Sequence, residues 1–198
     1  MDGHFYALLA RMRYIQRWAL MRNTEPENIQ EHSHMVAILA HALALIQNKH
    51  FGGHIDPGQA ALLAIYHDAT EILTGDLPTP IKYYNPALRA SYQEVEETAA
   101  NRLLELLPEE LRGDYAPYLL HPDPALEAVV KAADKLDAYL KCVKERKAGN
   151  GEFQTAQAQI WDALQANPLP ALGYFIQHYL PSFQLTLDEL NGSTHTMF

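Results

Sequence analysis

The stretch PGQAALLAIYHDATEILTGD, residues 57–76, decides the fold, because it has the composition of a buried helix. From Gln59 to Leu73 nearly every residue is apolar or small, as in a helix surrounded by other helices. The acidic and basic side chains of this segment are His67, Asp68 and Glu71. Burying such groups costs free energy unless each has a partner. The stretch therefore predicts a helical protein whose core contains a polar cluster.

The three polar residues of this stretch are predicted to share one side of the helix. At about 100° per residue, Glu71 lies roughly 40° from His67, and Asp68 lies roughly 100° from it. Ala60 and Ala64 lie on the same side, and their small side chains leave space for another group. Two interpretations remain open at this point: a buried hydrogen-bonded pair packed against another helix, or part of a ligand set.

The rest of the chain also reads as helices separated by clear boundaries. The pairs Asp56-Pro57, Asn85-Pro86 and Asp123-Pro124 predict helix starts, because an Asx side chain caps free amides and proline suits the first turn. Glycines, including Gly113, are expected to close elements. Apolar residues at helical spacing predict helices over residues 5–15, 35–46, 57–73, 86–107, 109–115, 124–148 and 172–180, and another after Gly151. Residues 77–86 form the long loop of an all-α bundle, expected to be one domain over residues 1–198.

Composition narrows the classes of partner. The chain has 198 residues, a formal net charge of -9, and one cysteine, Cys142. This charge argues against coating a nucleic-acid polymer or an anionic membrane. No stretch approaches the roughly 20 apolar residues that span a bilayer, and no basic segment followed by an apolar run begins the chain. We therefore expect a cytoplasmic protein with no nucleic-acid polymer and no membrane as partner.

Two further segments offer ligands to the polar cluster. In NIQEHSHMVAILAHAL, residues 28–43, His32 shares the inward face, whereas His34 and His41 point elsewhere. A lone histidine of this kind is more often an ordinary hydrogen-bonded core residue. In the helix after residue 124, Asp134 lies at the margin of the inner face and Asp137 lies nearer its centre, so periodicity does not choose between them and slightly favours Asp137. Two histidines with two aspartates would suit a divalent transition metal and its bound water.

The N-terminal segment is locally basic in an acidic chain. Between Asp2 and Glu25 there is no acidic residue, and this interval contains Arg11, Arg13, Arg17 and Arg22. The planar guanidinium group suits a phosphate dianion. A solvated helix face is the better interpretation for Arg11 and Arg13, whereas we favour anion binding for Arg17. Its neighbour Trp18 is more typical of a core residue by spacing alone.

The order His32, His67-Asp68 and Asp134 matches the H…HD…D signature of the HD superfamily of metal-dependent phosphohydrolases. The segments RWALMRN, NIQEHSHMVA, YHDATEILTGDLPTPIKYYN, VKAADKLDAYLKC and PSFQLTLDE together resemble bacterial HD-domain 5′-deoxynucleotidases over nearly the whole chain. The resemblance implies an HD-domain helical bundle that hydrolyses deoxyribonucleoside 5′-monophosphates to a deoxynucleoside and phosphate. It also implies a cytoplasmic homodimer with one divalent metal per chain, Co²⁺ or Mn²⁺.

The resemblance assigns roles residue by residue. The metal ligands are His32, His67, Asp68 and Asp134, and this choice prefers Asp134 over Asp137, which lies outside the family's pattern. Arg17 is implied to orient the phosphate, Trp18 to crowd the 2′ side of the sugar, and Glu71 to handle the attacking water. We expect few contacts that distinguish one base from another. The substrate-binding residues implied are Arg17, Trp18, Asp68, Asp76, Leu77, Pro78, Thr79 and Asp134.

Other members of the superfamily give the competing hypotheses. An HD hydrolase could act on ppGpp, a cyclic nucleotide or another nucleotide phosphoester. The ppGpp hydrolases carry an additional acid after HDxxE, where this chain has Ile72. A triphosphohydrolase would be longer and more basic. A non-catalytic HD signalling module typically loses metal ligands, and all four are present in this chain.

Overall fold

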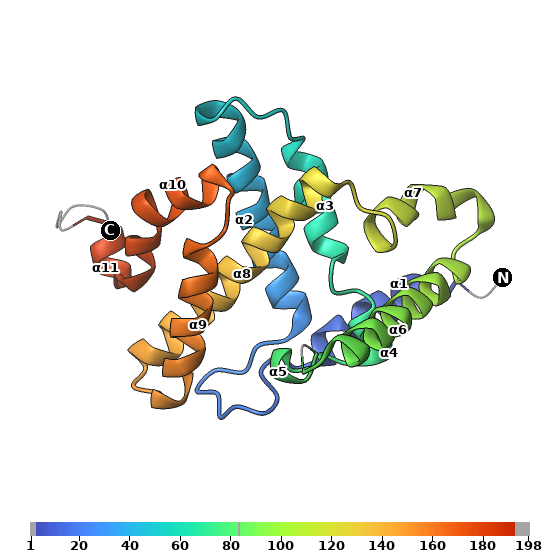
Figure 1. Ribbon diagram of the computed structural model, residues 1–198, viewed down its shortest axis with the longest axis horizontal. Coiled ribbons are helices and arrows are strands. Elements are labelled where there is room, and N and C mark those ends of the chain that lie inside the picture. The colour runs from blue at the N-terminus through green and yellow to red at the C-terminus, as the bar shows by residue number, and fades with distance from the viewer. Residues whose placement is uncertain (1–2, 83, 193–198) are drawn as a thin grey trace.

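The computed structural model describes residues 3–82 and 84–192, and every regular element in that part of the chain is a helix (Figure 1). An isolated antiparallel bridge joins Gln16 and Asn28. The prediction of an all-α protein is therefore confirmed. The elements are α1 (Phe5–Leu9), η1 (Ala10–Tyr14), α2 (Ile29–His50), α3 (Pro57–Tyr66), α4 (Glu71–Thr74), α5 (Thr79–Lys82), α6 (Pro86–Glu105), α7 (Glu109–Leu119), α8 (Pro124–Lys147), η2 (Gly151–Phe153), α9 (Gln154–Gln165), α10 (Pro170–His178), η3 (Leu180–Gln184) and α11 (Leu187–Leu190).

Two clusters of buried apolar residues organise the bundle. The larger one joins α2, α3 and α8 at the centre of the molecule, with α9 and α10 beside them (Figure 1). The smaller one lies beneath α1 and α6 and contains Phe5, Ala69, Leu103, Leu104 and Leu107. The chain therefore passes from the first cluster to the second between the end of α3 and Ala69, which is where His67 and Asp68 lie.

The predicted Asx-Pro helix starts are confirmed. Asp56, Asn85 and Asp123 are the N-cap residues of α3, α6 and α8, and each side chain accepts a hydrogen bond from an amide of the first turn. Asn28 does the same at the start of α2, where its side chain accepts from the amides of Gln30 and Glu31. This cap fixes the first turn of the helix that carries His32.

The single helix predicted over residues 57–73 is wrong. Helix α3 ends at Tyr66 and α4 begins at Glu71, and the four residues between them form turns. The amide of Ala69 donates to the carbonyl oxygen of Tyr66 instead of continuing the helical ladder. The reason is tertiary, because Ala69 is fully buried in the second apolar cluster. The stretch is also less enclosed than predicted, since Ile65 is 45% exposed.

Other boundaries also differ from the sequence-based expectation, and α2, for example, begins at Ile29 and ends at His50. The first helix changes to a 3-10 helix at Ala10, and the predicted loop of residues 77–86 contains the short helix α5. Gly113 closes no element and lies inside α7. Helix α7 continues beyond this glycine because its next turn is packed against α1. The ring centroids of Tyr115 and Phe5 lie 5.0 Å apart.

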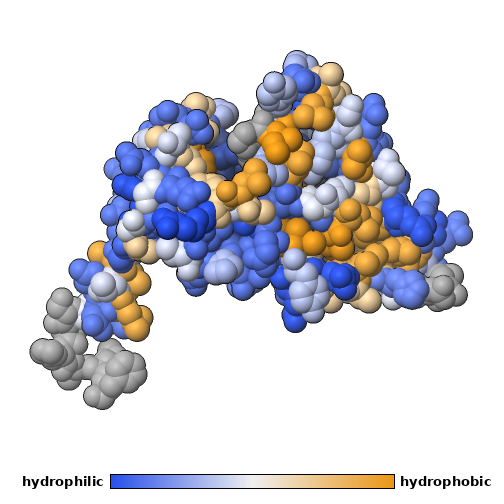
Figure 2. All heavy atoms as spheres, turned by 90° about the horizontal axis from the view of Figure 1, so that it is seen from below, coloured by the Kyte–Doolittle hydropathy of each residue, from blue (hydrophilic) through white to orange (hydrophobic). Residues whose placement is uncertain are grey.

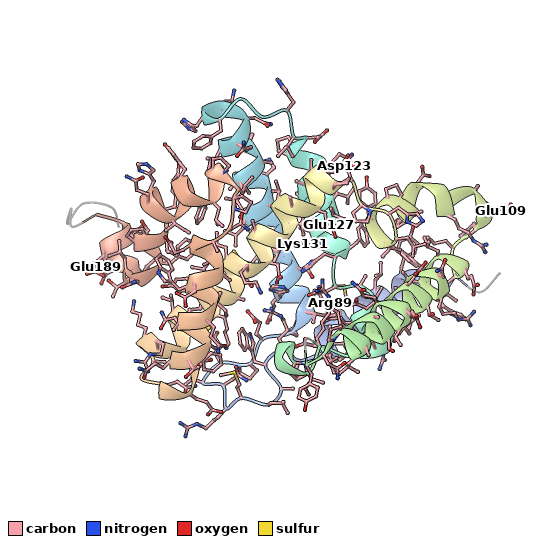
Figure 3. All side chains as sticks on the ribbon, in the orientation of Figure 1. Arg89, Glu109, Asp123, Glu127, Lys131 and Glu189 are labelled. Carbon is pink, nitrogen blue, oxygen red and sulfur yellow. The ribbon has the colours of Figure 1, made fainter. Side chains whose placement is uncertain are left out.

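The outer surface of the bundle is mostly polar. Charged side chains such as Glu109 on α7, Lys131 on the outer side of α8 and Glu189 on α11 are exposed (Figure 3). Figure 2 shows that apolar areas also remain on the face seen from below. Of the helices that the structure describes, none is long and apolar enough to cross a membrane.

Candidate metal centre and substrate site

The site lies where the first turn of α2, the turn after α3 and the middle of α8 meet. His32 follows the Asn28 cap of α2, and its side chain is buried. His34 and His41 are exposed, as predicted from the helical spacing. The turn between α3 and α4 contributes His67 and Asp68, whereas α8 contributes Asp134 and Asp137.

The four residues implied as metal ligands come together. The Nε2 atom of His32 lies 3.1 Å from Oδ1 of Asp134 and 3.5 Å from Oδ2 of Asp68. The Nε2 atom of His67 lies 3.3 Å from the same Asp68 oxygen. Ligand atoms of His32, His67 and Asp68 all lie within 4.8 Å of one another. The Nε2 atoms of both histidines are buried and make no hydrogen bond.

The opposite ring nitrogens explain why these Nε2 atoms suit a metal. Nδ1 of His67 lies 2.7 Å from the carbonyl oxygen of Ala64, which can only accept, so this nitrogen carries the proton. Nδ1 of His32 lies 2.6 Å from Oδ2 of Asp137 and donates to that carboxylate. In a neutral ring held this way, Nε2 presents its lone pair. The donor set of imidazole and carboxylate therefore fits a divalent transition metal.

Asp137, which helical periodicity slightly favoured as a ligand, contacts the far side of the His32 ring. The side chain is 8% exposed, and Oδ2 is bound to Nδ1 of His32. It therefore orients the histidine, in the manner of the carboxylates that support metal-binding histidines. Asp134 is half-exposed and faces Nε2.

The carboxylates of the site change the pKa values of its neighbouring groups in the direction that favours positive charge. Burial and the charge of Arg17 oppose protonation of His32, but Asp134 and Asp137 outweigh them and raise the pKa of His32 to about 9. Burial acts to raise the pKa of Asp134, but His32, His67 and Arg17 hold it well below its ordinary value. The carboxylates therefore favour a positive charge at this position, and a metal would compete with a proton for His32.

Glu71, the first residue of α4, is a buried acid beside this centre. Its Oε2 atom makes no hydrogen bond. Burial, together with the carboxylates of Asp68 and Asp76, raises the pKa of Glu71 to about 9. A divalent cation nearby would favour the ionised form instead.

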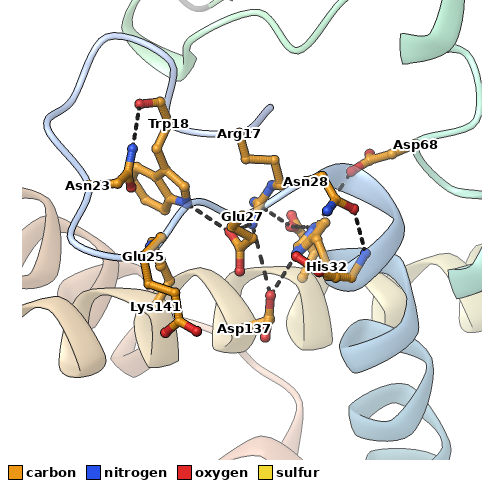
Figure 4. A network of polar contacts seen from close by, with 12 residues as sticks. Arg17, Trp18, Asn23, Glu25, Glu27, Asn28, His32, Asp68, Asp137 and Lys141 are labelled. Carbon is orange, nitrogen blue, oxygen red and sulfur yellow. Dashed lines mark hydrogen bonds and ion pairs between the residues drawn. The ribbon is translucent and has the colours of Figure 1, made fainter. Parts of the chain in front are cut away.

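Arg17 lies against the metal centre, whereas the other arginines of its segment do not. Its side chain is 13% exposed, and Nη1 donates to Oε2 of Glu27 at 2.7 Å (Figure 4). Nη2 lies 3.9 Å from Oδ1 of Asp134. Arg11 and Arg13 are exposed, which agrees with the solvated interpretation given to them.

Trp18 is partly buried on the loop that links η1 to α2, outside the two apolar clusters. Its backbone has φ of 58°, the left-handed region that non-glycine residues rarely adopt. The indole Nε1 donates to Glu27 at 3.0 Å, and the ring lies 5.4 Å from that of Phe153. The side chain of Asn23 donates to the carbonyl oxygen of Trp18 (Figure 4).

The predicted sugar-binding loop begins directly after α4. Burial raises the pKa of Asp76, while Arg17 and a hydrogen bond from the main chain of Trp18 oppose the rise. Asp76 therefore lies near both of these residues. Leu77 and Pro78 follow it and are partly buried, whereas the side chain of Thr79 lies outside the described part of the structure.

Sequence reasoning missed Glu27 as a member of the site. It stands between Pro26 and the N-cap Asn28, a position that reads as an ordinary acidic residue before a helix. Asp137 carried a detectable signal, because it lies one turn beyond Asp134 on the inward side of the same helix.

The fold is that of the HD-domain bundle, and the site within it is a candidate centre for a divalent metal. An HD-domain phosphohydrolase from Listeria innocua superposes with a TM-score of 0.81 at 20% identity, over 95% of this chain and 92% of that chain. A cyanophage S-2L HD phosphohydrolase, bound to dA and one catalytic Zn²⁺ ion, has a TM-score of 0.63 at 21% identity, over 91% of this chain and 96% of that chain. At these identities the likeness shows the fold, which is the HD-domain bundle that was predicted.

Sequence relatives give the family. The model of the YfbR-like 5′-deoxynucleotidases matches residues 4–183. A 5′-deoxynucleotidase of Vibrio parahaemolyticus is 52% identical over 192 residues, 96% of this chain and 99% of the relative. One from Shewanella oneidensis is 51% identical over 191 residues, 96% of this chain and 98% of the relative. The chain belongs to the YfbR-like 5′-deoxynucleotidase family and is a phosphomonoester hydrolase, as predicted.

Proposed function

We propose that this chain hydrolyses deoxyribonucleoside 5′-monophosphates to a deoxynucleoside and phosphate, with His32, His67, Asp68 and Asp134 holding one divalent metal. The observation that carries the proposal is the pair of buried Nε2 atoms without hydrogen bonds, which face two carboxylates. The nearly buried guanidinium of Arg17 beside them supplies the charge that a phosphate needs. Membership of the 5′-deoxynucleotidase family supports the substrate class.

The residues around the proposed metal ligands have separate roles in the reaction. When bound, the metal offsets phosphoryl charge and lowers the pKa of a coordinated water. Glu71 accepts the proton of the attacking water through its free carboxylate oxygen, and Arg17 holds the phosphate in line. The bond from the water oxygen to phosphorus forms as the bond to the 5′-oxygen breaks. The 5′-oxygen takes up the proton that Glu71 received from the water and leaves as the deoxynucleoside, which returns Glu71 to its starting state.

Sugar recognition is assigned to two parts of the chain, the segment after α4 and the residue that follows Arg17. The link between α4 and α5 contacts the deoxyribose through Asp76, Leu77 and Pro78. The family resemblance adds Thr79, the first residue of α5, to this set. Trp18 crowds the 2′ carbon, so that a 2′-hydroxyl would meet the indole ring. No set of residues is assigned to the base, and we therefore expect broad acceptance of the deoxynucleotide bases.

The molecular setting follows from the chemistry of the donors and from the family resemblance. Imidazole and carboxylate ligands suit Co²⁺ or Mn²⁺, which we propose as the supporting metals. We further propose that residues 1–198 form one domain, and that the protein works as a cytoplasmic homodimer. Its partners are then nucleoside monophosphates, and neither nucleic-acid polymers nor membranes.

The proposal is tested by phosphate release from a panel of ribo- and deoxyribonucleoside 5′-monophosphates with Co²⁺ or Mn²⁺ added. We expect release that EDTA abolishes and that is faster for the deoxy substrates. The variant Asp68→Ala should lose bound metal and activity together. Activity that persists in EDTA, or an Asp68→Ala variant with full metal content and turnover, would overturn the assignment of the centre.

A further inference from the structure

We propose that Glu27 is a positioning residue of the substrate site. One of its carboxylate oxygens orients the side chains of both Arg17 and Trp18. Oε2 of Glu27 accepts a hydrogen bond from Nη1 of Arg17 at 2.7 Å and another from Nε1 of Trp18 at 3.0 Å (Figure 4). The inference rests on the proposed roles of Arg17 in holding phosphate and of Trp18 in excluding the 2′-hydroxyl. It adds the residue that gives both side chains their direction.

Glu27 is itself held in place by the backbone. Its carbonyl oxygen accepts from the amide of Arg17 at 2.9 Å, and the amide of Ile29 donates to the carbonyl oxygen of Ile15 at 3.0 Å. These two bonds flank the isolated bridge between Gln16 and Asn28. Asn28 then caps α2, whose first turn carries His32. Glu27 therefore links the substrate loop to the helix that carries the first metal ligand.

The contact with Glu27 determines which way the Arg17 guanidinium faces. Two other carboxylates compete for it, because Nη2 lies 3.9 Å from Oδ1 of Asp134 and Nη1 lies 3.9 Å from Oδ2 of Asp137. The shorter bond to Glu27 holds Nη1 away from these groups. Nη2 is left beside the metal ligands, where a phosphate oxygen would be bound. Without Glu27, Arg17 would turn toward Asp134 and Asp137.

The same oxygen fixes the plane of the Trp18 ring. The residue has a strained backbone with φ of 58°, and such a conformation persists only where the surroundings over-determine it. Asn23 donates to the carbonyl oxygen of Trp18, and the ring of Phe153 lies 5.4 Å from the indole at an interplanar angle of 55°. The bond from Nε1 to Glu27 is then the polar contact that decides where the indole points.

The first experiment measures the geometry of Trp18 without reference to activity. The chain has two tryptophans, and the other one, Trp161, lies in α9 against Tyr139. In a Trp161→Phe background, Glu27→Ala should shift the emission of Trp18 and increase its quenching by acrylamide. The matched control is Glu25→Gln, because Glu25 is an exposed acid of the same loop. Identical emission and quenching in Glu27→Ala and the control would overturn the inference.

The second experiment measures kinetics on a matched deoxyribo- and ribonucleoside monophosphate. Glu27→Ala should lower the deoxy-to-ribo ratio of kcat/KM by about tenfold and raise KM for both substrates, which is the effect expected of a lost hydrogen bond to a charged group. Glu27→Gln keeps an acceptor oxygen and should fall between Glu27→Ala and the parent. Glu25→Gln should match the parent.

Trp18→Ala separates failure of this inference from failure of the proposed function. If Trp18→Ala loses selectivity and Glu27→Ala keeps it, the positioning role of Glu27 is wrong, whereas the role of Trp18 stands. If Trp18→Ala keeps full selectivity, the proposed role of Trp18 in excluding the 2′-hydroxyl is wrong. The positioning role of Glu27 is then tested by the change in Trp18 emission and by the change in KM. Equal loss of thermal stability in all variants, with unchanged selectivity and emission, would assign Glu27 a purely structural role and overturn the inference.

Discussion

At the scale of single residues, the distribution of protons and lone pairs around His32 and His67 defines the centre. Each Nδ1 is committed to an oxygen, from Asp137 for one ring and from Ala64 for the other. This leaves both Nε2 atoms to a metal. One partner is a side chain and the other a main-chain carbonyl, so only the contact made by Asp137 can be removed by substitution.

Replacement of Asp137 should therefore weaken metal binding while leaving the four ligands in place. We expect Asp137→Ala to lower the affinity for Co²⁺ or Mn²⁺ by about 10- to 100-fold, because the His32 ring loses its orienting carboxylate. The affinity is measured by isothermal titration calorimetry with the metal as titrant. Glu127→Gln, a surface change in the same helix, is the control. An affinity equal to that of the control would mean that Asp137 does not support the metal site.

Glu71 should affect turnover and leave metal binding unchanged. Its buried carboxyl group has an oxygen that makes no hydrogen bond, and Glu71 is not among the four proposed ligands. We expect Glu71→Gln to lower kcat by roughly 10²- to 10⁴-fold, because the amide cannot accept the proton of the water. Metal content should be measured on the same preparation. Normal turnover with normal metal content would remove Glu71 from the mechanism.

At the scale of elements, α8 connects the metal centre to the substrate loop through a stripe of polar residues. Asp134 and Asp137 occupy its middle, and Lys141 and Glu145 follow on the same side, one and two turns later. The carboxylate of Glu145 is buried and accepts from Lys141, from Asn150 and from the amide and hydroxyl of Thr24. These bonds fasten the loop after Trp18 to α8.

Stability should depend on pH through Glu145. Burial acts to raise its pKa, but the bonds from Lys141, Asn150 and Thr24 hold it well below the ordinary value of 4.5. A depressed pKa stabilises the fold above about pH 4.5, and that stability is lost as pH falls toward the folded-state pKa. Glu145→Gln should lower the free energy of unfolding by roughly 3 kcal/mol at pH 7, because it removes the carboxylate that neutralises the buried Lys141.

Urea denaturation at pH 7 and at pH 4 measures this difference. The gap between Glu145→Gln and the parent should narrow at the lower pH, because the unfolded parent then binds a proton on Glu145 that the folded parent still excludes. Glu127→Gln provides the control, since its partner Lys131 is 70% exposed and such a surface pair contributes little. A gap that stays constant between the two pH values would contradict this account of Glu145.

At the scale of the whole molecule, the four proposed metal ligands come from three separate parts of the bundle. His32 comes from α2, His67 and Asp68 from the turn between the two apolar clusters, and Asp134 from α8. A metal bound only by the folded chain should stabilise it by about 2.7 kcal/mol at 100 times its dissociation constant. For a chain of this size we expect the Tm to rise by about 5–10 °C.

Thermal unfolding with and without Co²⁺ checks this expectation, with Asp68→Ala as the paired variant. The parent should show the rise, and EDTA should reverse it. Asp68→Ala should show a much smaller rise, because one ligand is missing. An equal rise in both proteins would place the stabilising metal at some other site.

Local physics in the sequence determined a large part of this molecule. Asx caps followed by proline set the starts of α3, α6 and α8, and apolar spacing put His32 inside while His34 and His41 stayed outside. The H…HD…D order predicted the class of protein, and the extended resemblance predicted the family. These features depend on residues within a few positions of one another, or on motifs that can be read in order.

Only the tertiary structure decided how the site is assembled. The break between Tyr66 and Glu71 arises because Ala69 is buried under α6, and the role of Asp137 arises from a contact with a histidine 105 positions away. Glu27 joins Arg17 and Trp18 because a backbone bridge brings two ends of a loop together. Helical spacing predicts the direction in which a side chain points from the axis of its own helix. It does not state which group from another element will meet it there, because that depends on how the helices pack.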